Sequence, residues 1–127
     1  MVKNISDKKK FSIIQRAKSF NHAFRGLSIV VKTQHNIWIH FIIAIITMAF
    51  GLFFNISNIE WLVIVLTIGL VLITEILNTA LEIDIDLTSP TYHPYARDTK
   101  DVASAAVLIS VIIALIAGLI IFIPKVF

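Results

Sequence analysis

The sequence contains no cysteine and comparatively little charge. The absence of cysteine excludes a disulfide framework, a thiolate metal site and a cysteine nucleophile. Charged residues make up 15% of the 127 residues, against about 25% in ordinary soluble domains. Hydrophobic residues make up 57%, and the mean hydropathy is +0.89. This composition excludes an ordinary soluble globular protein and predicts one membrane domain, 1–127.

Lys, Arg, Asp and Glu are absent from two long stretches of the chain. The first, 37–54, would be about 27 Å long as a helix, close to the thickness of a bilayer core. The second, 102–123, is also long enough to cross a membrane. Between them, 61–83 is apolar except toward its acidic end, and its helical pattern continues to about Leu87. The sequence therefore predicts an all-α membrane protein with three transmembrane helices.

Proline is scarce, and two of the three prolines fall in the segment 88–99. Each removes a backbone donor and disfavours helix at the preceding residue, so this segment is predicted to be a loop. We expect Thr99 to cap the third transmembrane helix, which places Lys100 and Asp101 in its first turn. A helix N-terminus with a lysine beside it favours the binding of phosphate.

The segment 11–34 has the pattern of an amphipathic helix. Apolar residues recur every three or four positions on one face, and polar and cationic residues do so on another. Such a helix lies at the membrane interface with its cations toward anionic head groups; packing against a soluble partner is the alternative. The two faces consist of Ile14, Ala17, Phe20, Phe24, Leu27 and Val31, and of Lys18, Asn21, Arg25, Ser28 and Lys32.

Basic residues are distributed unevenly along the chain. Eight of the eleven Lys and Arg residues precede the first span, two lie in 84–101, and one follows the third span. By the positive-inside rule, the N-terminus and 84–101 are predicted to be cytoplasmic and the C-terminus to lie outside. Because these cations flank a membrane span, we expect no nucleic-acid partner. The eight are Lys3, Lys8, Lys9, Lys10, Arg16, Lys18, Arg25 and Lys32.

Six of the eight acidic residues fall between positions 75 and 101. Three of them share one helix face with Asn78, within an arc of about 80°. These three are Glu75, Glu82 and Asp86. A carboxylate near hydrocarbon is costly unless it is paired or faces water, so we expect cations or a divalent metal to compensate this stripe. Three spans form too small a bundle to enclose it, which favours an oligomer.

These acids are predicted to differ in their exposure to water. Asp84 and Asp98 are predicted to be solvated, whereas Glu75 lies closest to the apolar run and is suited to accept a proton. A lysine, a helix N-terminus and carboxylates at one boundary are what a magnesium nucleotide needs. The chain has no glycine-rich phosphate loop and no soluble kinase motif, so a kinase here must be of another design.

Several short motifs stand in order along the chain. They are Glu75-Ile-Leu-Asn78-Thr-Ala-Leu-Glu82, Asp86-Leu87, Ser89-Pro90, His93-Pro94 and Lys100-Asp101-Val-Ala, with Ser19-Phe20, Ala23, Gly26, Asn36, His40, Glu60-Trp61 and Ala105-Ala106-Val107-Leu108. Together they resemble the signature of the small prokaryotic diacylglycerol kinase family, which includes undecaprenol kinases. The resemblance covers most of the chain after about residue 16.

The resemblance implies an integral membrane homotrimer of the bacterial inner membrane. Each subunit has an amphipathic helix and three transmembrane helices, and active sites lie at subunit contacts. The implied reaction transfers the γ-phosphoryl group of magnesium ATP to a lipid hydroxyl at the cytoplasmic interface. The run from Asp86 to Pro94, the Glu60-Trp61 pair and the C-terminal Ile-Pro-Lys resemble the undecaprenol kinase branch more than the diacylglycerol branch, and both lipids stay open as acceptors.

The roles of individual residues are also implied by the resemblance. It makes Glu75 the catalytic base beside the lipid and Asn78 an active-site amide. It makes Glu82 a metal-binding carboxylate and places Ser104 near the lipid substrate. The nucleotide contacts that it implies are Tyr92, His93, Lys100 and Asp101.

One position departs from the family pattern. Gln34 stands where the family usually has a glutamate that binds the metal. Because an amide oxygen ligates a hard cation without adding charge, we expect weaker binding of Mg²⁺ without loss of the reaction. Two other functions stay open. One is a noncatalytic homologue, suggested by Gln34, and the other is a small ion-coupled transporter subunit with Glu75 as the ion carrier.

Overall fold

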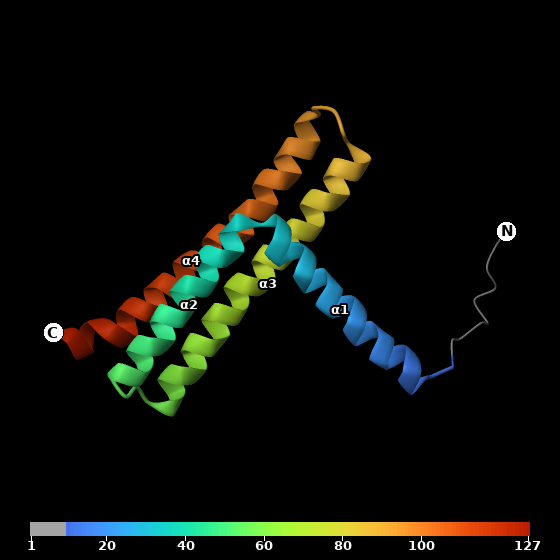
Figure 1. Ribbon diagram of the computed structural model, residues 1–127. Helices are drawn as coiled ribbons and strands as arrows, with labels where there is room; N and C mark the ends of the chain where they lie inside the picture. The colour runs from blue at the N-terminus through green and yellow to red at the C-terminus, as the bar shows by residue number, and fades with distance from the viewer. Residues whose placement is uncertain (1–9) are drawn as a thin grey trace.

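The fold is a bundle of three long helices from which a fourth helix departs (Figure 1). The computed structural model describes residues 10–127. The helices are α1 (Ile13–Thr33), α2 (His35–Phe53), α3 (Asn58–Thr88) and α4 (Pro94–Val126), and the described residues contain no strand. The last three helices are each long and apolar enough to cross a membrane. The predicted all-α fold with three such helices is therefore confirmed.

The first helix, α1, meets the bundle at its C-terminal end and runs across the direction of the other three (Figure 1). Ser12 caps its N-terminus by accepting a backbone N–H of the first turn at 3.4 Å. Only Val30 is buried, while Phe20 and Phe24 are 68% and 67% exposed. An open apolar face on a cationic helix is the form expected at a membrane interface. Three of the N-terminal cations counted above lie outside the described residues, namely Lys3, Lys8 and Lys9.

The turn between α2 and α3 is tightly packed. Asn55 has a φ of 50°, in the left-handed region that asparagine enters more readily than most residues. Ser57 and Glu60 form a capping box at the start of α3. A Cβ atom at Gly51 would lie 2.7 Å from the ring of Trp61, so the close approach of the two helices requires glycine here.

The apolar core lies at this same end of the bundle. Its buried members are Ile56, Ile64 and Ile121, and the rings of Trp61 and Phe122 pack against them. α3 is the central helix because it contacts each of the other three, and α4 packs along much of its length.

At the opposite end, α3 and α4 form a long hairpin that extends beyond the start of α2 (Figure 1). The prediction that Thr99 caps the second helix of this hairpin is wrong. α4 already begins at Pro94, because Nδ1 of His93 accepts a backbone N–H of the first turn at 3.1 Å and proline suits the first helical position. The Thr99 hydroxyl instead donates to a carbonyl one turn earlier, at 2.8 Å. Lys100 and Asp101 therefore lie beyond the first turn.

Candidate active site

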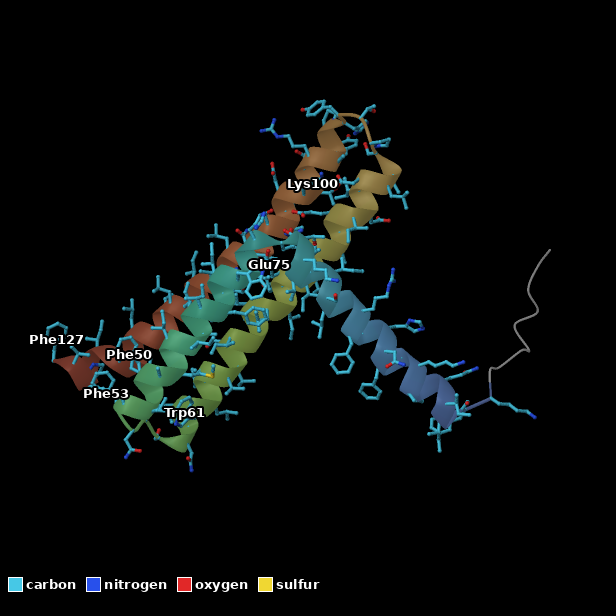
Figure 2. All side chains as sticks on the ribbon, viewed as in Figure 1. Phe50, Phe53, Trp61, Glu75, Lys100 and Phe127 are labelled. Carbon is cyan, nitrogen blue, oxygen red and sulfur yellow. The ribbon has the colours of Figure 1, made fainter. Side chains whose placement is uncertain are left out.

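Glu75 is a buried carboxylate on α3, with 2% of its surface exposed. The Nε2 atom of His40, on α2, lies 3.6 Å from Oε2 of Glu75, which is within ion-pair range but longer than a hydrogen bond. Figure 2 shows Glu75 near the level at which α1 meets the bundle. A buried carboxylate with so little compensation is costly to maintain, as is typical of a functional group.

A cavity of about 290 Å³ lies beside Glu75, between α2, α3 and α4. Its polar lining residues are Asn36, His40, Glu75, Asn78 and Ser104, and the remaining ones are apolar. The Ser104 hydroxyl donates to a backbone carbonyl of its own helix at 3.0 Å. The structure thus gathers around one cavity the predicted base, the predicted amide and the serine expected near the lipid.

The side chain of Asn78 is buried and only partly satisfied. Its Nδ2 atom donates to Oε1 of Glu82 at 3.3 Å. Its Oδ1 atom is buried and has no hydrogen-bond partner among the described residues. A buried acceptor without a partner costs about 1–3 kcal/mol, and this one belongs to a residue that lines the same cavity as Glu75.

Glu82, seven residues beyond Glu75 on the same helix face, is held by two amides. In addition to Asn78, it accepts a hydrogen bond from Nε2 of Gln34, with 3.3 Å between the nitrogen and Oε2. Gln34 is the residue between α1 and α2, so this bond ties the corner of the two helices to α3. We expected cations or a metal to compensate the acidic stripe. At Glu82, two neutral amide groups donate hydrogen bonds to the carboxylate instead.

At Asp86, the last carboxylate of the acidic stripe, a cation does compensate the negative charge. Nζ of Lys100, on α4, lies 2.6 Å from Oδ1 of Asp86 and donates a hydrogen bond to it. This bond, with a further contribution from the charge of Glu82, raises the pKa of Lys100 above its ordinary value. Lys100, labelled on α4 in Figure 2, is therefore a cation that interacts with the charges of both carboxylates.

The predicted nucleotide contacts lie together at the hairpin. Tyr92, His93, Lys100 and Asp101 line one hollow of about 290 Å³, together with Arg97. Tyr92, His93 and Asp101 are exposed. Asp101 pairs weakly with Arg97, one helical turn away, at 3.8 Å. The hollow also lies at the N-terminus of α4, where backbone N–H groups favour an anion.

The two groups of predicted residues occupy neighbouring hollows and do not merge into one. Asp86, at the hairpin hollow, lies eleven residues beyond Glu75, which corresponds to about 16 Å along α3. Asp84 and Asp98 are both exposed, as predicted for solvated acids. The described residues contain no cluster of three His, Cys, Asp or Glu side chains suited to hold a metal.

His40 was not predicted as a site residue, although it is the side chain facing the Glu75 carboxylate. An ionisable residue inside an uncharged span is a recognised sign of function, and His40 has that position in 37–54. Asn36, which lines the same cavity, has no comparable signal in the sequence, because a polar residue at a helix start is common.

Comparison with known proteins gives consistent matches. The family model described as prokaryotic diacylglycerol kinase matches residues 21–122. The chain is 41% identical over 108 residues to an undecaprenol kinase of Bacillus subtilis, covering 85% of this chain and 88% of that protein. It is 40% identical over 101 residues to a diacylglycerol kinase of Synechocystis, covering 79% and 58%. It is 39% identical over 62 residues to a diacylglycerol kinase of Escherichia coli, covering 49% and 51%.

Proposed function

Because the chain belongs to the prokaryotic diacylglycerol kinase family, we propose that it is a lipid kinase that transfers the γ-phosphoryl group of magnesium ATP to the hydroxyl of a membrane lipid, undecaprenol or diacylglycerol. The observation that carries this proposal is the cavity lined by the buried Glu75 and by Asn78, whose Oδ1 atom has no hydrogen-bond partner within 10–127. Both groups accept hydrogen bonds, and a lipid alcohol brings the donor that such a cavity lacks.

In the proposed reaction, Glu75 is the general base. It takes the proton of the acceptor hydroxyl as the hydroxyl oxygen bonds to the γ-phosphorus, and the bond from that phosphorus to the β,γ-bridging oxygen breaks to release ADP. Asn78 orients the hydroxyl through its free oxygen and orients Glu82 through its amide nitrogen. His40 holds the Glu75 carboxylate toward the cavity from across the helix interface.

The donor set around Glu82 suits magnesium. The Glu82 carboxylate and the amide oxygen of Gln34 are hard oxygen ligands, and magnesium in kinases is bound by one or two carboxylates together with phosphate oxygens. When bound, the ion would neutralise charge that develops on the phosphates. Glu82 and Gln34 would hold it, with Gln34 turning its side-chain oxygen toward the ion.

The hairpin hollow is the proposed nucleotide site. The protonated Lys100 and the N-terminus of α4 offer positive charge to phosphates. Tyr92 and His93 offer exposed rings for the base, and Asp101 with Arg97 forms the outer rim. A nucleotide bound there would lie on the side of Glu82 that faces away from the predicted hydrocarbon core.

The membrane topology completes the proposal. An N-terminus in the cytoplasm places α1 along the inner surface of the bacterial inner membrane and Glu75 at that same level. The hairpin then extends into the cytoplasm, where ATP is available, and the C-terminus lies outside. The cavity is open at its side, and a homotrimer would cover it by placing active sites at subunit contacts.

The test is transfer of labelled γ-phosphate from magnesium ATP to undecaprenol and to diacylglycerol, presented separately in mixed micelles. We expect one or both lipids to be labelled, and we expect Glu75→Ala to abolish the labelling. Asp84→Ala is the matched control, because Asp84 is an exposed acid on the opposite face of the same helix. Retained transfer in folded Glu75→Ala protein would overturn the role of the base, and no transfer by the unmodified protein would overturn the kinase.

A noncatalytic nucleotide-binding homologue is the second candidate, and Gln34 is the observation that favours it. The hydrogen bond from its amide nitrogen to Glu82 occupies a carboxylate that would otherwise be free for a metal. Binding of labelled ATP without transfer to either lipid, followed by a gain of transfer in Gln34→Glu, would favour this candidate over the kinase.

A further inference from the structure

The corner between α1 and α2 is made by a single extended residue, Gln34. Its φ and ψ angles are −108° and 112°, whereas its neighbours on both sides belong to the two helices. Its backbone N–H donates to the Val30 carbonyl of α1 at 2.9 Å, and its side chain donates to Glu82 of α3 at 3.3 Å. A change in the bend between α1 and α2 would therefore move the side chain that reaches Glu82.

Trp38, on α2, bridges this corner. Its indole Nε1 donates to the carbonyl of Val31 at 3.0 Å, seven residues earlier in the chain and on α1. The last four carbonyls of a helix have no partner within that helix, and the carbonyl of Val31 is one of these in α1. A side chain of α2 thus caps the C-terminal end of α1, with Gln34 enclosed between the two bonded residues.

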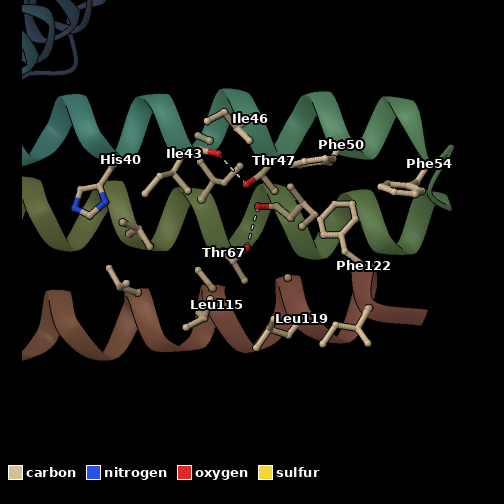
Figure 3. A pocket seen from close by; sticks show the side chains of 18 of the residues that line it. His40, Ile43, Ile46, Thr47, Phe50, Phe54, Thr67, Leu115, Leu119 and Phe122 are labelled. Carbon is tan, nitrogen blue, oxygen red and sulfur yellow. Dashed lines mark hydrogen bonds between the residues drawn. The ribbon is translucent and has the colours of Figure 1, made fainter. Parts of the chain in front are cut away.

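Farther along α2, an apolar groove of about 490 Å³ lies between α2 and α4, over α3 (Figure 3). Two threonines line the groove, but each hydroxyl bonds to its own helix. Thr47 donates to the Ile43 carbonyl at 2.8 Å and Thr67 to the Ile64 carbonyl at 3.0 Å. Neither hydroxyl therefore ties α2 to a neighbouring helix, so the bonds at the corner are important for the position of the first turns of α2.

On the basis of the proposed function, we propose that Trp38 is a positioning residue of the kinase. Its bond to the Val31 carbonyl sets the bend between α1 and α2, and the bend holds the Gln34 side chain beside Glu82, where the metal is proposed to bind. In this role Trp38 acts through Gln34 and touches neither the lipid nor the nucleotide.

A simpler role for Trp38 is that of a membrane anchor. Its side chain is 53% exposed, and its ring packs edge-on against Phe41 with 6.2 Å between the ring centroids. Tryptophans gather at membrane surfaces because the ring suits the interface. An anchor depends on the ring, whereas the positioning role depends on the N–H group, so the two roles can be separated by substitution.

Two variants separate the N–H group of Trp38 from its ring. Trp38→Phe keeps an aromatic ring beside Phe41 and removes the donor. Trp38→Gln removes the ring and keeps an N–H donor at the same number of bonds from Cβ. The positioning role predicts a defect in Trp38→Phe that Trp38→Gln rescues, and the anchor role predicts the reverse.

The measurement is the magnesium concentration at which a labelled, non-hydrolysable ATP analogue is half-bound, in detergent and without lipid. Trp38→Phe should raise this concentration by about two- to tenfold, the range for loss of one neutral hydrogen bond, and Trp38→Gln should leave it near the unmodified value. In a Gln34→Ala background, Trp38→Phe should have no further effect, because the residue through which it acts is gone. At saturating magnesium ATP, Trp38→Phe should keep the unmodified kcat for lipid.

Trp61→Phe is the matched control, because it is the same change at the other tryptophan of the chain. The ring of Trp61 packs against the buried core at the start of α3. Trp61→Phe should therefore lower the thermal midpoint, as the loss of buried volume does, and leave the magnesium concentration unchanged. Trp38→Phe should do the reverse, so a general loss of stability cannot imitate the expected result.

Three results would overturn the inference. They are an unchanged or lowered magnesium concentration in Trp38→Phe, an equal rise in Trp38→Gln, and the same rise when Trp38→Phe is added to Gln34→Ala. Each of them leaves the kinase itself standing as long as Glu75→Ala abolishes transfer. Failure of the unmodified protein to label any lipid is a distinct result that overturns the proposed function, because binding of the analogue is measured without transfer.

Discussion

Each end of the helical bundle has an ion pair between a lysine and a carboxylate. Toward the hairpin end, there is also a buried polar atom without a hydrogen-bond partner among the described residues. Where α3 begins, Lys125 and Glu60 lie 3.0 Å apart beside a capping box. At the hairpin end, Lys100 and Asp86 lie 2.6 Å apart, while Oδ1 of Asn78 nearby has no partner among the described residues. Because native structures satisfy nearly all buried polar groups, the hairpin end retains polar capacity for a ligand.

Packing is also tighter at the end where α3 begins than around Glu75. The core cluster and the close contact of Gly51 with Trp61 lie at the start of α3. Around Glu75, the helices instead leave a cavity with polar lining residues. The comparison indicates that one end holds the bundle together and the other end is kept open for substrates.

The largest expected difference is between the two lysines. Lys100→Met should lower kcat/KM for ATP by about 10- to 100-fold, the range for losing a hydrogen bond from a charged group. Lys125→Met should leave kcat/KM unchanged and lower the thermal midpoint slightly, because an ion pair that is partly open to solvent contributes little. Steady-state kinetics in micelles and thermal unfolding in the same detergent measure the two effects. Equal kinetic losses in both variants would remove the distinction between the ends.

Two glycines of the bundle differ in how closely their surroundings are packed. At Gly51, alanine places its Cβ 2.7 Å from the rigid ring of Trp61, and such overpacking costs about 1–3 kcal/mol. Gly118→Ala meets no atom and gains helix propensity, so it should be neutral or stabilising. Unfolding in a series of denaturing detergent concentrations measures both. A destabilised Gly118→Ala with an unaffected Gly51→Ala would contradict the close packing at Gly51.

The parts of this comparison that lie within one helix could be predicted from the sequence. The uncharged stretches predicted the spans, and a period of 3.6 residues predicted that Glu75, Asn78 and Glu82 share a face. In the structure, Glu75 and Asn78 do line one cavity, and Asn78 donates to Glu82. The cap of α4 was missed, because the proline that suits a helix start at Pro94 was read only as a helix breaker.

The parts that depend on packing between helices could not be predicted in this way. Gln34 and Glu82 are 48 residues apart in sequence, and no local period relates them. His40 and Glu75 meet only because α2 packs on α3. The apolar groove results from the way in which α2 and α4 both lie on α3, so it has no signature in any single segment.

A smaller effect is expected at the proposed metal site. Gln34→Glu would replace the amide donor of Glu82 by a second carboxylate, and the repulsion between them is relieved by magnesium. The magnesium concentration for half-maximal activity should fall by about tenfold, or about 1.4 kcal/mol of binding free energy. Gln15→Glu, which adds the same charge to exposed α1, is the matched control. An unchanged magnesium dependence in Gln34→Glu would place residue 34 outside the metal site.

The smallest expected effect is the acid sensitivity of the end where α3 begins. The backbone N–H of Ser57 donates to Glu60 at 2.8 Å, and this bond, followed by the contact with Lys125, lowers the pKa of Glu60. A carboxyl whose pKa is lower in the folded state stabilises the fold above its unfolded value of about 4.3, and this contribution is lost as the pH falls through the folded pKa. The thermal midpoint of the unmodified protein should therefore fall more in acid than that of Glu60→Gln.

The hydrogen bond from Ser57 and the contact with Lys125 both lower the pKa of Glu60, and a control variant can separate them. Because the Ser57 bond is the largest cause, Lys125→Met should keep part of the acid-dependent loss, and Glu60→Gln should remove it. Other carboxyls titrate alike in all three proteins, so differences between their thermal midpoints at pH 7 and in acid isolate Glu60. If Lys125→Met removes the loss as fully as Glu60→Gln does, the ion pair and not the helix cap lowers the pKa of Glu60. The start of α3 would then resemble the hairpin end, where the contact of Lys100 with Asp86 is the main cause of the raised lysine pKa.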